Sequence, residues 1–165
     1  ALPASIGGVT ANADIESFCI TGDGSMMMNL QELSTIVYNR LIIKIICLNN
    51  SGYSMIKQTQ DQWMNSDYFA SSNEGGLGFP DFCKVVESFG IKSLKITKNE
   101  EIKEILKKFI NSKESIFLDV KITQNSRVIP QVKFGRPNED TEPLLSRDKF
   151  FQEMIVKPYE VSLKK

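Results

Sequence analysis

The feature of this sequence that most constrains its fold is a run of aliphatic residues at positions 41–48, interrupted only by Lys44. A nearly continuous apolar run of this length is typical of a strand that is buried on both faces of a parallel sheet. Parallel neighbours are joined by crossover connections, which are usually helices. The run therefore predicts a parallel sheet with helices packed against it.

The rest of the sequence alternates between strand and helix patterns. Apolar residues alternate, as they do in strands, over residues 16–21, 92–96 and 116–122. They recur at helical spacing over residues 29–40, 82–89 and 102–110. Further helices are expected over residues 2–13, 58–63 and 150–155. This order predicts βαβ units with right-handed crossovers, and hence a doubly wound, mostly parallel α/β sheet with helices on both faces.

Residue choices also predict where some of these helices begin and end. Gly90 follows the apolar stripe of residues 82–89, as expected of a helix C-cap. Thr97 and Glu100 have the spacing of a capping box, in which two side chains satisfy backbone N–H groups at a helix start.

The length of 165 residues suits one domain with a proper hydrophobic core. We expect residues 1–165 to form a single domain on which a proline-containing tail, residues 123–165, packs. The sequence begins with Ala1 rather than Met, and its first residues read like the middle of a fold. We therefore expect a fragment of a longer, multidomain chain.

Composition excludes several classes of function. Twenty basic residues balance twenty acidic ones, so no overall field favours nucleic acid or a membrane surface. The chain has no histidine, which excludes mechanisms that need a histidine from this chain. Its three cysteines have no CxxC spacing, and we interpret them as small buried hydrophobic residues of a cytoplasmic, reducing compartment.

The segment Gly22-Asp23-Gly24-Ser25 stands between the predicted strand over residues 16–21 and the next helix. Glycines let backbone amides approach an oxyanion, and a helix start favours negative charge. The carboxylate of Asp23, however, would repel a bare phosphate. A hard cation such as Mg²⁺ resolves this conflict, because it takes oxygen ligands from protein and phosphate alike.

A second ligand is expected at the end of the neighbouring strand. Asn49 and Asn50 follow the run at residues 41–48, and Asn50 lies 27 residues after Asp23. One helix and one strand account for that spacing and return the chain to the same sheet edge, where adjacent strands lie about 4.8 Å apart. The two side chains can therefore share one ion. Gly52 permits a turn that would offer a backbone carbonyl as a third ligand.

These paired motifs resemble the thiamine diphosphate motif, and the wider sequence resembles the C-terminal cofactor-binding domain of acetolactate-synthase-like enzymes. The resemblance rests on "ALPASIGG", "GDGSMMMNLQELSTIV" and "IIKIICLNNSGYSMIKQTQ", and it covers roughly residues 1–120. A lone Gly-Asp-Gly would be a weak signal, whereas its combination with an asparagine pair at the next strand end is specific. The resemblance implies a thiamine-diphosphate-binding fold.

The resemblance also implies roles for the motif residues. Asp23 and Asn50 would bind Mg²⁺ through their side chains, and Gly52 through its carbonyl oxygen. The residues expected to hold thiamine diphosphate are Gly22, Asp23, Gly24, Ser25, Asn50, Gly52, Tyr53 and Met55.

The same resemblance implies half an active site. In the family, the glutamate that activates the cofactor lies on a pyrimidine-binding domain, usually of a partner subunit. No catalytic residue is therefore assigned here, and the fragment alone is expected to be inactive. The complete protein is expected to be a homodimer or homotetramer that acts on a 2-oxoacid. Whether it also binds FAD stays open, because some relatives bind FAD on a middle domain.

Position 59 bears on the kind of reaction. Authentic acetolactate synthases tend to have a tryptophan where this chain has Thr59. The segments "GYSMIKQTQ" and "EPLLSRDKFFQEMIV" are similar to relatives from bacterial surface-sugar biosynthesis, some of which add a two-carbon unit from pyruvate to a keto-sugar nucleotide. The resemblance therefore implies a 2-oxoacid-decarboxylating carboligase and leaves both pathways open.

Other interpretations stay open at this point. The chain could be the natural small subunit of a two-chain 2-oxoacid decarboxylase, or a non-catalytic doubly wound module that binds a metal ion at Asp23 without phosphate. We expect at least two of Met26, Met27 and Met28 in the core, because methionine commonly fills irregular core space. We expect Lys57 to be a solvated helix residue rather than a contact for an acidic substrate.

Overall fold

The computed structural model describes residues 1–12 and 14–163. The chain divides into two compact units, Ala1–Ser126 and Arg127–Lys165, and each is described by itself. The first unit contains the whole predicted sheet. The expected packing of the tail, residues 123–165, on the rest of the chain stays a prediction.

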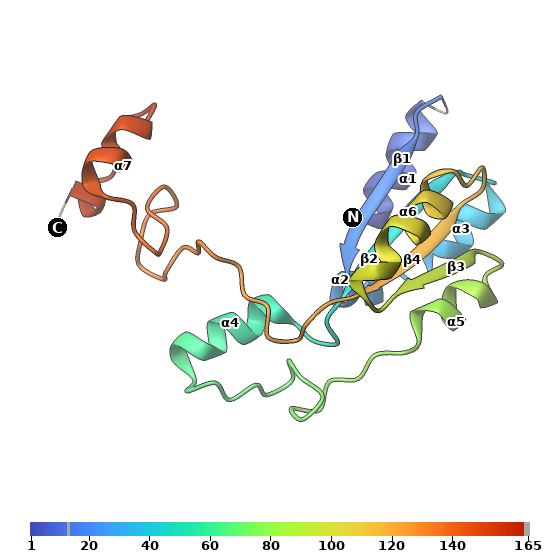
Figure 1. Ribbon diagram of the computed structural model, residues 1–165, viewed down its shortest axis with the longest axis horizontal. Helices are drawn as coiled ribbons and strands as arrows, with labels where there is room; N and C mark the ends of the chain where they lie inside the picture. Colours follow the sequence, from blue (N-terminus) through green and yellow to red (C-terminus); the bar gives the residue numbers. More distant parts are fainter. Residues whose placement is uncertain (13, 164–165) are drawn as a thin grey trace. The chain divides into compact units, whose positions relative to one another are not determined.

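The first unit is built on a sheet of four parallel strands in the order β1-β2-β4-β3 (Figure 1). The strands are β1 (Ser17–Gly22), β2 (Ile43–Asn49), β3 (Lys92–Ile96) and β4 (Ile116–Lys121). The aliphatic run at residues 41–48 thus forms β2, one of the two central strands, as its composition predicts. Non-consecutive neighbours in this order require helical crossovers, so the prediction of a parallel α/β sheet is confirmed.

Helices cover both faces of this sheet. The first unit contains the helices α1 (Leu2–Ala11), α2 (Asp23–Met27), α3 (Glu32–Tyr38), α4 (Ser54–Trp63), α5 (Phe82–Ser88) and α6 (Ile102–Ile110), with the short 3₁₀ helix η1 (Asn99–Glu101) before α6. Side chains of α1, α2, α3 and α5 share one core cluster with Ile45 and Phe117 of the sheet. On the other face, Phe109 of α6 packs with Ile116 and Leu118. The predicted doubly wound architecture is confirmed.

Cover on the α6 side does not extend over the whole sheet. The α6 helix packs against β3 and β4. On the same face, Ile20 of the edge strand β1 is 60% exposed, although Phe18 of β1 still reaches the Phe109 ring at 6.4 Å between centroids. The outer part of this face is therefore apolar and exposed in the first unit.

The second unit, Arg127–Lys165, contains α7 (Arg147–Glu153) and the 3₁₀ helix η2 (Glu160–Leu163). Its best-defined contact is polar: both terminal nitrogens of Arg147 donate to the two carboxylate oxygens of Asp140, at 3.0 and 2.8 Å. The Asp140 side chain is 2% exposed, and the Arg147 guanidinium also lies over the ring of Phe150. This bidentate pair joins α7 to the segment that precedes it.

Several predicted boundaries differ from the structure. The helix expected over residues 29–40 is the shorter α3, Glu32–Tyr38, and a separate short helix, α2, precedes it at Asp23–Met27. The capping side chain before α6 is that of Glu101, whose Oε2 accepts from the N–H groups of Thr97 and Lys98. The sequence predicted Glu100 instead, which is one position too early because the helical turn begins at Asn99. In the tail, α7 begins three residues earlier and ends two residues earlier than the helix expected over residues 150–155, since it spans Arg147–Glu153.

The N-terminal helix α1 ends at Ala11, and Ala13, included in its predicted range, lies outside the described residues. Within the part of the chain that the structure describes, every helix is too short or too polar to cross a membrane.

Candidate functional site

A cavity of about 590 Å³ opens at the carboxyl ends of β1 and β2. Parallel sheets collect ligands at this edge. All eight residues that the sequence predicts to hold a cofactor line this cavity, and five further residues complete it: Met28, Leu48, Ser54, Ile56 and Ile122. The structure therefore brings the two motifs together, while the ligand they hold stays a prediction.

Asp23 is buried at the point where β1 ends and α2 begins, with 3% of its surface exposed. Its Oδ1 accepts from the backbone N–H of Gly24 at 2.7 Å. Its Oδ2 accepts from the N–H groups of Asn50 at 3.1 Å and Gly52 at 3.3 Å. Burial raises the pKa of Asp23 above its ordinary value, and these backbone N–H groups act in the opposite direction.

Asn50 supplies a second side-chain oxygen beside Asp23. Its Oδ1 accepts from the backbone N–H of Gly52 at 3.2 Å, and its Nδ2 donates to the hydroxyl of Ser54. The same Gly52 N–H also points at Asp23 Oδ2. One N–H therefore serves oxygens of both predicted metal ligands, which places these two oxygens close together.

These groups fit the chemistry of Mg²⁺. One carboxylate and one amide oxygen converge, and hard cations prefer such oxygen ligands. Among the described residues, no three His, Cys, Asp or Glu side chains form a metal-binding group. A site with a single carboxylate leaves positive charge on the ion unbalanced, so it suits a cation that arrives with an anionic ligand such as a diphosphate.

The glycines of the motifs are required by close approaches. A Cβ on Gly24 would lie 2.4 Å from Cε1 of Tyr53, and a Cβ on Gly52 would lie 3.0 Å from the carbonyl oxygen of Ser71. The Tyr53 ring is held from the other side by Phe79, edge to face at 5.8 Å between centroids. Gly24 thus packs against the loop after β2, and Gly52 against the loop after α4, with little room for a side chain at either position.

The rest of the cavity wall is apolar and open. Met28, Met55 and Ile56 are 73%, 61% and 50% exposed, and Leu48 and Ile122 line the same space. The prediction that at least two of the three consecutive methionines lie in the core is wrong. Only Met26 of the three is in the core at 1% exposed, because the short helix α2 turns its next two residues outward.

Lys57 also differs from its prediction, because it is buried rather than solvated, at 5% exposed. Its Nζ donates to the carbonyl of Gln124 at 3.3 Å and lies 4.6 Å from the ring centroid of Tyr68. The loop after α4 folds back over this lysine, and the polar, glycine-rich sequence of that loop gave no sign of it. Lys57 does not line the cavity at the strand ends.

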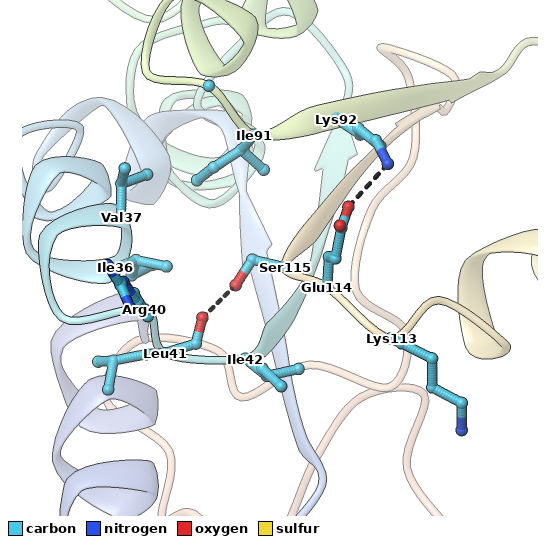
Figure 2. A pocket seen from close by; sticks show the side chains of 11 residues that line it. Ile36, Val37, Arg40, Leu41, Ile42, Ile91, Lys92, Lys113, Glu114 and Ser115 are labelled. Atoms are coloured by element: carbon cyan, nitrogen blue, oxygen red, sulfur yellow. Dashed lines mark hydrogen bonds and ion pairs between the residues drawn. The ribbon is translucent and has the colours of Figure 1, made fainter.

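A separate hollow of about 400 Å³ lies where the amino ends of β2, β3 and β4 meet α3 (Figure 2). Two polar contacts cross it: the Ser115 hydroxyl donates to the carbonyl of Leu41 at 2.6 Å, and Lys92 pairs with Glu114 at 2.7 Å. None of the predicted site residues lines it. These two contacts join the starts of the strands.

Comparison with known proteins gives three findings. The model of the family described as "Thiamine pyrophosphate enzyme, C-terminal TPP binding domain" matches residues 1–120. The acetolactate synthase large subunit of Pyropia yezoensis is 36% identical over 137 residues, which is 83% of this chain and 23% of that protein. That of Buchnera aphidicola subsp. Schizaphis graminum (strain Sg) is 39% identical over 142 residues, 84% of this chain and 24% of its own length.

Among solved structures, the thiamine diphosphate-dependent 4-hydroxybenzoylformate decarboxylase of Rhodococcus jostii RHA1 matches with a TM-score of 0.67. Sequence identity is 19%, so this match speaks for the fold alone; it covers 76% of this chain and 23% of that one. The chain thus spans about a quarter of the length of the relatives it matches.

Proposed function

Because this chain belongs to the thiamine pyrophosphate enzyme family as its C-terminal TPP binding domain, we propose that the cavity at the strand ends holds the diphosphate of thiamine diphosphate through Mg²⁺. The observation that carries the proposal is the convergence of Asp23 Oδ2 and Asn50 Oδ1 on the N–H of Gly52. Two oxygen ligands are thereby brought together by neighbouring parallel strands, at the edge of the sheet where such ligands bind.

Each residue has a role in this proposal. Asp23 and Asn50 hold the cation with their side-chain oxygens, and Gly52 adds its carbonyl oxygen. The diphosphate is bound by the hydroxyl of Ser25 and by backbone N–H groups near Gly24 and Tyr53. Gly22 leaves space at the end of β1, where a Cβ would find only Leu48 O at 3.9 Å. Met55 and the apolar wall exclude water from the organic part of the cofactor.

We further propose that the complete protein is a 2-oxoacid-decarboxylating carboligase, on the strength of its acetolactate synthase relatives. Thiamine diphosphate supplies the carbanion chemistry when bound. The residues of this chain bind and orient it, and the activating glutamate comes from a pyrimidine-binding domain of the same or a partner subunit. This chain alone is then inactive, and the assembly is a homodimer or homotetramer.

Thr59 supports a proposal about the pathway. It lies on the exposed side of α4, one turn after Met55 of the cavity wall, and its hydroxyl donates to the Met55 carbonyl at 3.1 Å. A threonine here leaves more space than the tryptophan of acetolactate synthases. We therefore propose a reaction in surface-sugar biosynthesis, with an acceptor larger than a simple 2-oxoacid, as the alternative to acetolactate synthesis.

The test is the thermal stability of the full-length protein with Mg²⁺, with thiamine diphosphate and with both. A ligand that binds only the folded state adds about 2.7 kcal/mol at a hundredfold excess over its dissociation constant. We expect a shift that needs both ligands and is lost in Asp23→Ala. Asp67→Ala, at an exposed aspartate that does not line the cavity, is the matched control and should keep the shift.

Two outcomes would contradict the proposal. A wild-type protein that shows no shift with both ligands does not bind the cofactor. A shift with Mg²⁺ alone, unchanged by thiamine diphosphate, would instead favour a metal-binding module without phosphate.

A further inference from the structure

We propose that Asp119 is a positioning residue for the cation site, because its buried carboxylate orients the side chain of Asn49, which in turn holds the loop that supplies the cation ligands. The inference rests on the proposed function. It concerns a residue on β4 that does not line the cavity and that no sequence motif singled out.

The first step is the contact between Asp119 and Asn49. The two residues lie near the carboxyl ends of the neighbouring strands β4 and β2, where Asp119 pairs with Cys47 in the parallel register. Both are buried, at 1% and 2% exposed. The Nδ2 of Asn49 donates to Oδ1 of Asp119 at 2.9 Å. A carboxylate oxygen can only accept, so this contact selects the amino end of the Asn49 amide.

The second step is at the other end of the same amide. With Nδ2 directed at Asp119, Oδ1 of Asn49 faces the chain that follows. There it accepts from the backbone N–H of Ser51 at 3.2 Å and lies 3.4 Å from the Ser51 hydroxyl. A rotated amide would instead present its amino group to the Ser51 N–H, and two donors would face each other.

The third step is the conformation of Ser51. Its φ is +56°, a left-handed value that residues with a Cβ rarely adopt. The hydrogen bonds that Ser51 donates to Oδ1 of Asn49 help to hold it there. Ser51 stands between Asn50 and Gly52, whose N–H groups both donate to Oδ2 of Asp23. The left-handed turn at Ser51 is therefore what directs these groups at the cation site.

The same carboxylate also has two charged neighbours on its other oxygen. The Nζ atoms of Lys121 and Lys95 lie 3.5 and 4.0 Å from Oδ2 of Asp119, and their side chains are 37% and 43% exposed. These ion pairs leave Oδ1 to the buried amide of Asn49. The hydrogen bond to Asn49 is the contact of Asp119 that reaches toward the cavity.

The experiment compares four variants in the full-length protein: Asp119→Leu, Asp119→Asn, Asn49→Leu and the double variant Asn49→Leu/Asp119→Leu. Two quantities are measured: the affinity for thiamine diphosphate with Mg²⁺, and the hydrogen exchange of the Gly52 amide without either ligand. Loss of a group that orients metal ligands typically weakens binding 10–100-fold. We expect a loss of about tenfold or more in Asp119→Leu, together with faster exchange at Gly52.

Asp119→Asn keeps an oxygen that can accept from Asn49, so its affinity should stay within about threefold of the wild type, well below the usual loss for an orienting group. The double variant should bind no more weakly than Asn49→Leu alone, because residues that act through one contact are not additive. Phe117→Leu is the control for stability. Phe117 is buried on the same strand, two residues away, and does not line the cavity, so this variant should lower the melting temperature and leave affinity unchanged.

Three results would overturn the inference: wild-type affinity in Asp119→Leu, equal losses in Asp119→Leu and Asp119→Asn, or additive losses in the double variant. Failure of the proposed function looks different, because the wild-type protein itself would then bind no thiamine diphosphate. In that case the inference falls with the function on which it rests.

Discussion

The ring of Tyr53 occupies the space into which a Cβ at Gly24 would project, with Cε1 and Cδ1 at 2.4 and 2.7 Å from that position. The two residues belong to different motifs, one at the end of β1 and the other after β2. Their contact means that the second glycine of Gly-Asp-Gly is required for packing between the loops, in addition to any approach of its backbone to a diphosphate.

Gly24→Ala should therefore displace the Tyr53 ring and lower both stability and cofactor affinity. Overpacking of this kind costs about 1–3 kcal/mol. Gly7→Ala is the control, because a Cβ at Gly7 meets no atom within 4 Å and alanine favours a helix over glycine by up to about 1 kcal/mol. Denaturant unfolding of both variants checks the prediction, which fails if Gly24→Ala is as stable as the wild type.

Asn50→Asp separates binding of the cation from binding of the diphosphate. A second carboxylate beside Asp23 should tighten Mg²⁺ alone, because hard cations favour anionic oxygen ligands. The same added charge should weaken thiamine diphosphate by repulsion. Calorimetric titrations with Mg²⁺ alone and with both ligands measure the two effects. Asn50→Ala, which has no side-chain oxygen, should weaken both, and a parallel change in the two affinities of Asn50→Asp would contradict the assignment.

Ser115→Ala should destabilise the sheet at its other end. The Ser115 hydroxyl donates to the carbonyl of Leu41 at 2.6 Å and accepts from the N–H of Ile43 at 3.0 Å, so it joins the starts of β4 and β2 (Figure 2). Leaving such groups without partners costs about 1–3 kcal/mol. Thermal unfolding measures the loss. Ser34→Ala, at an exposed position of α3, should be nearly neutral, and equal effects in the two variants would count against the bridging role.

The second unit should lose stability in acid through one carboxyl group. Hydrogen bonding from Arg147, aided by its charge, holds the pKa of Asp140 below its ordinary value of 3.8. A lowered pKa in the folded state stabilises the fold above pH 3.8, and this contribution is lost as the pH falls through the lowered pKa.

Hydrogen exchange of the Ser162 amide, which donates to the Tyr159 carbonyl at 2.9 Å, reports on this unit. Its protection should fall in that acidic range in the wild type. In Arg147→Met the protection should already be reduced above pH 3.8, and this acid-dependent loss should disappear, because an Asp140 pKa that is no longer lowered leaves no difference in proton binding between the folded and unfolded states. Arg136→Met is the control, since Arg136 contributes least among the groups that act on Asp140. An unchanged profile in Arg147→Met would refute the prediction.

Local patterns in the sequence were enough to predict the sheet and the two loops of the site. The aliphatic run containing Lys44 indicated a buried parallel strand, and the spacing from Asp23 to Asn50 indicated two strand ends side by side. Both signals lie within a single βαβ unit, where the chain itself fixes which strands are neighbours.

Features that depend on distant segments could not be read in the same way. Asp119 meets Asn49 across 70 residues, and its aspartate looks like any polar residue at a strand end. Lys57 is buried only because Tyr68 and Gln124 fold over it. Met28 is exposed because it lies between α2 and α3. The spacing of apolar residues did not predict this break between the two helices.

The pairing of Gly22 with Leu48 in the β1–β2 ladder determines which side chains meet at the ends of the two strands. A slip of one residue would move one strand by about 3.3 Å and turn its side chains to the opposite face. Asp23 and Asn50 would then no longer meet. On the proposed function, a molecule with a slipped register would therefore lack the paired oxygens that hold the cation.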